Sequence, residues 1–107
     1  MNLPNVVQEL INAQNNFDSV AYANLFSETS VVYDEGKTHT GRKEIQQWIA
    51  EANENYKSTM QPVGYTETGN KSILSAEVSG TFPGSPAVLK FTFEINEGLI
   101  QSLKVTG

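Results

Sequence analysis

The sequence predicts a single α+β domain in which helices pack against a curved, mostly antiparallel sheet. Apolar residues recur at helical spacing in the first half of the chain, most clearly over residues 41–56. From residue 59 onward, β-rich segments alternate with short Gly- and Pro-containing turns, which indicates an antiparallel meander. A chain of 107 residues is long enough for one hydrophobic core, so we expect one domain over residues 1–107.

Two short helices are expected first, over residues 4–16 and 19–27. Pro4 suits a first-turn position, where its missing N–H has no partner to lose. Asp18 can cap the second helix by accepting from the free N–H groups of its first turn. The side chains expected to face the core from these helices are Val6, Val7, Leu10, Ile11, Gln14, Val20, Ala21, Leu25 and Phe26.

A strand over residues 30–34, a turn, and an extended segment over residues 38–40 should follow. Side chains alternate between the two faces of a strand, so Val32 and Asp34 should share one face. A long helix over residues 41–56 comes next, with one apolar stripe. This stripe consists of Ile45, Trp48, Ile49, Ala52 and Tyr56.

Four further strands are expected over residues 59–68, 71–82, 88–96 and 99–105. Pro62 marks a bulge or a sheet edge in the first of them. The adjacent Ile73 and Leu74 break the alternation of the second, which predicts a bulge or burial on both faces. The third strand is the most regular and places on one face Leu89, Phe91, Phe93 and Ile95.

Composition excludes several classes of function. Seven basic and 12 acidic residues give a net charge of −5 without a basic cluster, which argues against nucleic-acid and anionic-membrane partners. The chain has no cysteine, and its one histidine excludes a multi-His metal site. An all-oxygen metal site stays possible, but the acidic residues lack the loop spacing of calcium sites, and we expect no metal or other cofactor. No signal peptide and no run of ~20 apolar residues is present, which favours a cytoplasmic protein.

The run FDSVAYANLFSETSVVYDEGKTHTGRKEIQQWI, residues 17–49, resembles the NTF2-like superfamily, particularly its SnoaL-like bacterial members. The matching features are Asp18, Leu25-Phe26, Asp34, Gly41, Ile45 and Trp48. The resemblance implies a cystatin-like cone in which the sheet wraps around the long helix and leaves a cavity. It implies no single activity, because the superfamily includes ketosteroid isomerases, polyketide cyclases, dehydratases, epoxide hydrolases and non-catalytic modules.

Asp34 and His39 are the candidate catalytic residues. Asp34 falls where ketosteroid-isomerase-like members place their general base, and burial in an apolar cavity would raise its pKa. His39 follows five residues later across a turn, so the two side chains could meet. The simpler alternatives are an Asp34 that caps the turn and a His39 that is partly exposed and bonds the backbone.

The oxyanion-binding acids of ketosteroid isomerases have no counterpart in this chain. The resemblance aligns Leu10 and Phe91 with their positions. Steroid isomerisation by that mechanism is therefore not expected, because loss of one oxyanion donor typically costs about 10²–10³ in rate.

Aromatic side chains are the expected wall for a ligand, although the same spacing is typical of an ordinary core. Trp48 is the first choice for a ligand contact, and Tyr22 or Tyr33 could donate hydrogen bonds. The ligand-binding candidates are Tyr22, Phe26, Trp48, Tyr56, Phe91 and Phe93.

Two functions fit these observations. The first is binding of a small apolar or aromatic molecule in the cone, together with acid–base chemistry of the isomerase, cyclase or dehydratase type. The second is a non-catalytic binding or homodimerisation module. Relatives commonly dimerise through the sheet, and the apolar face of residues 88–96 favours a homodimer of that kind. Whether the chain is an enzyme stays open at this point.

Overall fold

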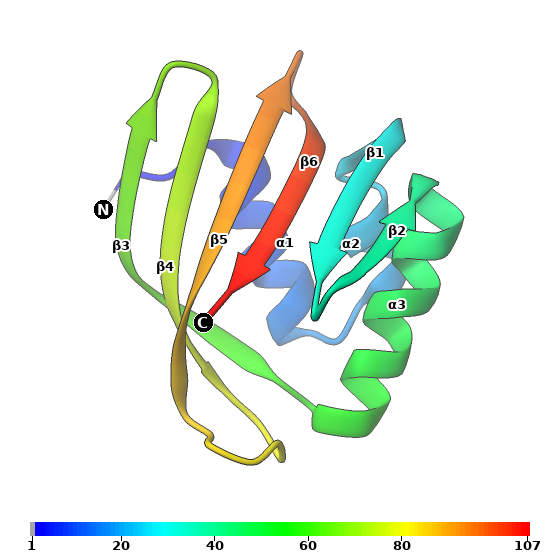
Figure 1. The fold of residues 1–107 in the computed structure, drawn as a ribbon, viewed down its shortest axis with the longest axis vertical. Helices are drawn as coiled ribbons and strands as arrows, with labels where there is room; N and C mark the ends of the chain where they lie inside the picture. Colours follow the sequence, from blue (N-terminus) through cyan, green and yellow to red (C-terminus); the bar gives the residue numbers. More distant parts are fainter. Residues whose placement is uncertain (1) are drawn as a thin grey trace.

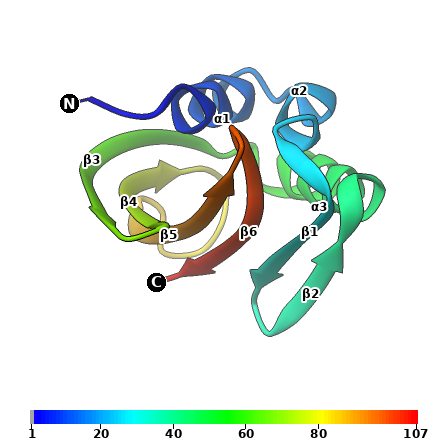
Figure 2. The ribbon, with the colours of Figure 1, turned by 90° about the horizontal axis from the view of Figure 1, so that it is seen from above.

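A curved six-stranded sheet carries three helices on its concave side (Figures 1 and 2). The computed structural model describes residues 2–107. The helices are α1 (Asn5–Asn15), α2 (Ser19–Ala23) and α3 (Gly41–Tyr56). The strands are β1 (Phe26–Asp34), β2 (Lys37–Thr40), β3 (Thr59–Thr68), β4 (Lys71–Ser79), β5 (Ala87–Asn96) and β6 (Leu99–Thr106). This arrangement confirms the predicted α+β class.

The strands lie in the order β2-β1-β6-β5-β4-β3. Strands β3 to β6 form the predicted antiparallel meander. Strand β1 then pairs in parallel with β6, with Tyr33 opposite Lys104. This pair joins the β1–β2 hairpin to the meander. No helix within residues 2–107 is long and apolar enough to cross a membrane.

Helix α2 is shorter than predicted. Asp18 caps it as expected, since Oδ1 accepts from the Ala21 N–H at 3.0 Å. The helix ends at Ala23 because the next residues join the sheet, where the Ile100 N–H donates to the Leu25 carbonyl at 2.9 Å. Helix α2 has little more than one turn, so the spacing of its apolar residues does not determine which of its faces points toward the core. The prediction for Val20 and Ala21 is wrong, since both are exposed while the Tyr22 side chain is buried.

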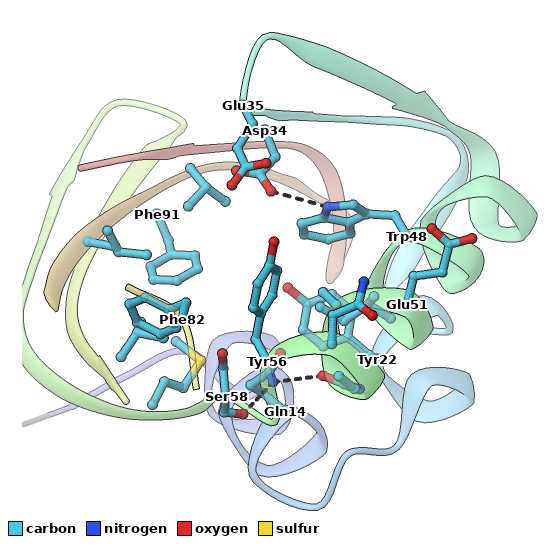
Figure 3. A pocket seen from close by; sticks show the side chains of 18 of the residues that line it. Gln14, Tyr22, Asp34, Glu35, Trp48, Glu51, Tyr56, Ser58, Phe82 and Phe91 are labelled. Atoms are coloured by element: carbon cyan, nitrogen blue, oxygen red, sulfur yellow. Dashed lines mark hydrogen bonds between the residues drawn. The ribbon is translucent and has the colours of Figure 1, made fainter. Parts of the chain in front are cut away.

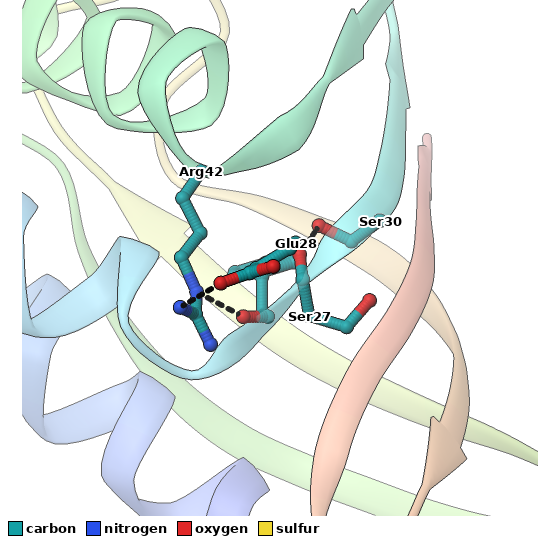
Figure 4. A network of polar contacts seen from close by, with 5 residues as sticks. Ser27, Glu28, Ser30 and Arg42 are labelled. Atoms are coloured by element: carbon teal, nitrogen blue, oxygen red, sulfur yellow. Dashed lines mark hydrogen bonds and ion pairs between the residues drawn. The ribbon is translucent and has the colours of Figure 1, made fainter.

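The start of β1 is tied to the first turn of α3 (Figure 4). Arg42 Nε donates to the Phe26 carbonyl at 2.7 Å, and its guanidinium lies 3.8 Å from the Glu28 carboxylate. Ser30 Oγ donates to the Ser27 carbonyl at 2.6 Å. These polar contacts hold the irregular stretch after Phe26, where the register with β6 shifts, and so extend β1 upstream of its predicted start.

Of the two irregularities predicted in the meander, the structure contains the one at Pro62 in β3 and lacks the one at Ile73 and Leu74 in β4. Strand β3 is an edge strand and shifts register between Pro62 and Gly64, which confirms the prediction for Pro62. Strand β4 ends at Ser79 and alternates without interruption. The expected bulge or two-sided burial at Ile73 and Leu74 is wrong, because Leu74 is fully buried while Ile73 is 38% exposed on the opposite face.

The helices cover the two sides of the concave sheet face. Helix α3 packs against β1 and β2, and α1 packs against β3 (Figure 2). The apolar face of β5 points inward, where Phe91 and Phe93 are buried. A cavity opens where this inward face is not covered by a helix.

The Gly80→Ala substitution should destabilise the fold. A Cβ at Gly80 would lie 2.5 Å from the Tyr56 carbonyl oxygen and 2.8 Å from Ser58 Oγ, so the backbone must shift. We expect a loss of about 1–3 kcal/mol in the free energy of unfolding, measured by urea denaturation. The matched control is Gly64→Ala, whose Cβ would lie 3.8 Å from Ser75 Cβ. Equal midpoints for the two variants would contradict the close approach at Gly80.

Candidate functional site

A cavity of about 740 Å³ lies between the concave face of the sheet, α3 and the β4–β5 loop. Its volume is in the range of small-molecule sites. The lining residues that are exposed, and therefore border its opening, are Glu35, Lys37, Glu51, Asn55, Tyr56 and Pro83. Two buried polar residues, Gln14 and Asn53, line its closed end.

Asp34 lies on the cavity wall at the end of β1. Strand alternation places it on the same face as the fully buried Val32, as predicted. The preceding residue, Tyr33, pairs with Lys104 of β6, which is followed by Val105, another cavity residue. Burial raises the pKa of the Asp34 carboxyl above its usual value of 3.8, and the negative charge of Glu35 adds to the rise. Trp48 and, more weakly, His39 oppose this shift in pKa.

Trp48 connects the two candidate catalytic residues. Its Nε1–H donates to Asp34 Oδ2 at 3.2 Å (Figure 3). Its ring stacks on the His39 imidazole, with centroids 5.5 Å apart and an interplanar angle of 28°. The Tyr22 ring packs edge-on against the same indole, with the centroids of the two rings 6.2 Å apart. One indole therefore orients the carboxylate and packs against the imidazole.

His39 also lines the cavity, but its contact with Asp34 is indirect. In the β1–β2 hairpin it pairs with Val32, two residues before Asp34. No hydrogen bond joins the Asp34 and His39 side chains anywhere in the described chain of residues 2–107. Asp34 and His39 therefore lie near each other, as their spacing in the sequence predicts, but the Trp48 ring connects them in place of a direct contact.

Tyr22 supplies a hydroxyl inside the cavity. Its side chain is almost completely buried and lines the cavity. Among residues 2–107 the hydroxyl has no hydrogen-bond partner, and no fully enclosed side-chain polar atom is unpartnered, so this oxygen opens to the cavity. Burial and the nearby Asp34 charge raise the pKa of Tyr22 well above 10, which keeps the hydroxyl a neutral donor. The other tyrosine considered, Tyr33, is 47% exposed outside the cavity.

The remaining predicted ligand residues divide into two groups. Tyr56 and Phe91 line the cavity, where the Tyr56 ring packs edge-on against Phe82 at 6.3 Å. Phe26 and Phe93 are fully buried in the core and do not line the cavity.

The structure places no oxyanion donor at the two positions that the resemblance aligns with those of ketosteroid isomerases, because the residues there are Leu10 and Phe91. Leu10 is fully buried in the core, and Phe91 lies on the cavity wall. The hydroxyl of Tyr22 therefore enters the cavity from a position that the alignment does not mark.

The sequence did not predict the polar closed end of the cavity. Gln14 Nε2 donates to Asn53 Oδ1 at 3.0 Å and to the Ser58 carbonyl at 2.7 Å. Gln14 was expected only as a core position. The available signal was Asn53, which follows Ile45 and Ile49 at spacings of four on the buried face of α3.

Acidic and imidazole side chains are not clustered for metal binding. Within residues 2–107, no three His, Asp or Glu side chains lie close enough together to bind a metal ion.

Residues 7–102 match the family model described as SnoaL-like domain. A similar solved structure is a proposed polyketide cyclase from Sinorhizobium meliloti, with 35% identity over 97% of this chain and 95% of that one and a TM-score of 0.93. A protein of ketosteroid isomerase-like fold from Catenulispora acidiphila, in complex with trimethylamine, shares 19% identity over 99% and 87%, with a TM-score of 0.88.

A third similar structure is SalBIII, an epoxide hydrolase/cyclase-like enzyme with a role in pyran ring formation in the polyether salinomycin. It shares 21% identity over 94% of this chain and 86% of its own, with a TM-score of 0.77. None of the curated proteins searched matches this chain.

The Trp48→Phe substitution should raise the pKa of Asp34 further. The indole N–H stabilises the carboxylate form, and Phe keeps an aromatic ring but loses this donor. The measurement is a ¹³C NMR titration of the Asp34 carboxyl carbon. Tyr56→Phe is the control, since no hydrogen bond links Tyr56 to Asp34 in the part of the chain that the structure describes. An Asp34 pKa unchanged by Trp48→Phe would refute this hydrogen bond.

The Asp34→Asn substitution should stabilise the protein at neutral pH. The folded-state pKa of Asp34 lies above its unfolded value, so its ionisation favours unfolding as pH rises through the folded-state pKa. The difference in free energy of unfolding between the variant and the parent should therefore shrink as pH falls, and it should vanish below about pH 3.8, the usual pKa of an Asp carboxyl. Urea denaturation of both proteins at several pH values tests this, and a variant less stable than the parent at pH 7 would contradict it.

Proposed function

This chain belongs to the SnoaL-like domain family, and we propose that it binds a small apolar or aromatic molecule in its cavity and performs acid–base chemistry on it. The observation that carries the proposal is the Asp34 carboxyl, whose pKa is raised by burial and which Trp48 orients on the cavity wall. A base with a raised pKa accepts protons more strongly, and a fixed orientation lowers the cost of reaching the reactive geometry.

The proposed reaction begins with proton transfer from a carbon next to a carbonyl group. Asp34 takes the proton, and the C–H electron pair moves into the carbonyl to give an enolate. The neutral hydroxyl of Tyr22 donates a hydrogen bond to the oxygen where negative charge develops. With a β,γ-unsaturated substrate the enolate extends into a dienolate, and return of the proton from Asp34 to its γ carbon completes an isomerisation. Attack of the enolate carbon on a second carbonyl carbon of the same molecule instead closes a ring and leaves an alkoxide, which takes the proton back from Asp34 and completes a cyclisation. His39, whose imidazole also lines the cavity and stacks on Trp48, assists from the same wall.

The names of the similar structures favour this class of chemistry. One is a proposed polyketide cyclase at 35% identity, and another is an epoxide hydrolase/cyclase-like enzyme. Both names refer to reactions on oxygenated carbon skeletons. The apolar residues at Leu10 and Phe91 argue against a steroid isomerase with the usual pair of oxyanion acids.

The alternative is a non-catalytic module that binds a ligand or forms a homodimer through its sheet. The face of β5 that suggested a dimer is occupied by the core and the cavity, since Phe91 and Phe93 are buried. The exposed residues that would support such a dimer are Val63, Ile73 and Val88. Ligand binding without proton exchange in the following experiment would favour this alternative.

We expect the protein to accelerate exchange of the α-protons of 2-tetralone with D₂O, a reaction that NMR follows directly. Asp34→Asn should slow the catalysed exchange by about 10²–10³, because the general base is lost. The rate should rise with pH through the raised pKa of Asp34 and then level off, because the ionised carboxylate is the active form.

Glu77→Gln is the matched control, since this exposed carboxylate does not line the cavity. It should exchange 2-tetralone at the parent rate. If Asp34→Asn also exchanged at the parent rate, Asp34 would not be the base.

A further inference from the structure

We propose that the closed end of the cavity is a second recognition site, where Asn53 and Gln14 bind a neutral group that both accepts and donates hydrogen bonds, such as a carboxamide or a hydroxyl. The inference rests on the proposed function, in that a small molecule occupies the cavity. Figure 3 places Gln14 and Ser58 on the side of the cavity opposite Asp34 and Glu35. The proposal therefore concerns the end of the ligand that is remote from the base.

A backbone carbonyl fixes the orientation of both amides. The Ser58 carbonyl can only accept, so Gln14 must present its Nε2 to it, at 2.7 Å. The same Nε2 lies 3.0 Å from the Asn53 side chain, which must therefore present Oδ1. Both hydrogens of Gln14 Nε2 are then used. Gln14 Oε1 is left as an acceptor, and Asn53 Nδ2 is left as a donor.

These two leftover atoms open to the cavity. Within residues 2–107 neither has a hydrogen-bond partner, and no fully enclosed side-chain polar atom in that range is unpartnered. Gln14 is only 8% exposed and Asn53 only 9% exposed, and both residues line the cavity. A ligand that leaves such buried groups unpaired binds more weakly, whereas a group that satisfies both gains from them.

The closed end favours a neutral group over an ion. Its other lining residues include Ser58, Met60 and Val78, none of which carries a charge. The charged lining side chains Glu35, Lys37 and Glu51 are exposed, at the opening of the cavity. An ion moved to the closed end would lose its hydration without gaining a counter-charge.

Neighbouring contacts hold the two amides in place. Asn15 Oδ1 accepts from the Met60 N–H at 2.7 Å, and Asn15 Nδ2 donates to the Met60 carbonyl at 3.1 Å. This pair fastens the end of α1 to the start of β3, directly beside Gln14 and Ser58. The donor and acceptor are therefore positioned before a ligand arrives, which lowers the entropic cost of binding.

The test uses two probes of the same shape, 3-phenylpropanamide and 4-phenylbutan-2-one, which differ in whether the terminal group can donate. We expect the amide to bind about tenfold more tightly, because the ketone leaves Gln14 Oε1 unpaired. Binding is followed by ¹H–¹⁵N NMR, in which the Asn53 side-chain NH₂ signals report on the closed end and the Trp48 indole signal reports on the Asp34 end.

Asn53→Asp retains the oxygen that accepts from Gln14 and replaces the free donor by an acceptor. It should weaken amide binding about tenfold. Asn96→Asp makes the same chemical change at an exposed position outside the cavity and should alter affinity less than twofold. If Asn53→Asp does not fold, the comparison of the two probes in the parent protein decides the matter.

Equal binding of the two probes, with a shift at Trp48 and none at Asn53, would overturn the recognition site and leave the proposed function standing. If neither probe shifts Trp48 or Asn53, ligand binding in the cavity fails, and the recognition site fails with it.

Discussion

The limited helical cover of a curved sheet determines most of what this molecule can do. Helix α3 occupies the β1–β2 side of the concave face and α1 occupies the β3 side. The inward residues of the central strands, such as Leu89, Phe91 and Val105, therefore line an open space. Because β1 runs along this space, the alternation that buries Val32 also turns Asp34 toward it. The raised pKa of Asp34 is thus a consequence of where the helices stop.

Within that space, the polar groups are divided between two ends of different character. Asp34 belongs to the end that carries charge, where Trp48 links it to His39. The other end holds the neutral amides of Gln14 and Asn53. A molecule that fits both ends has an apolar body, a polar terminus and a reactive centre near the carboxylate.

Local patterns predicted the fold well, and contacts between distant segments account for the misses. The helical spacing of residues 41–56 and the turns of the meander are local signals, and both elements were confirmed, although Tyr56 of the predicted stripe is exposed. The end of α2 depends on a bond from Ile100, 75 residues beyond Leu25, which no window of sequence contains. At the site, the alternation of side chains along β1 was sufficient to predict which way Asp34 points. The amide pair of Gln14 and Asn53 spans 39 residues, so spacing alone could not reveal it.

The β2 strand has a kinetic consequence. It contains four residues, lies at the edge of the sheet, and pairs on one side only, with β1. Short edge elements open locally at much lower free energy than the core. His39 thus lies on a short edge strand, whereas Gln14 of α1 is bonded to Asn53 of α3 and to the Ser58 carbonyl just before β3. Ligand exchange through the β2 side would leave the amide pair assembled, so that the polar terminus is the last part of a departing ligand to be released.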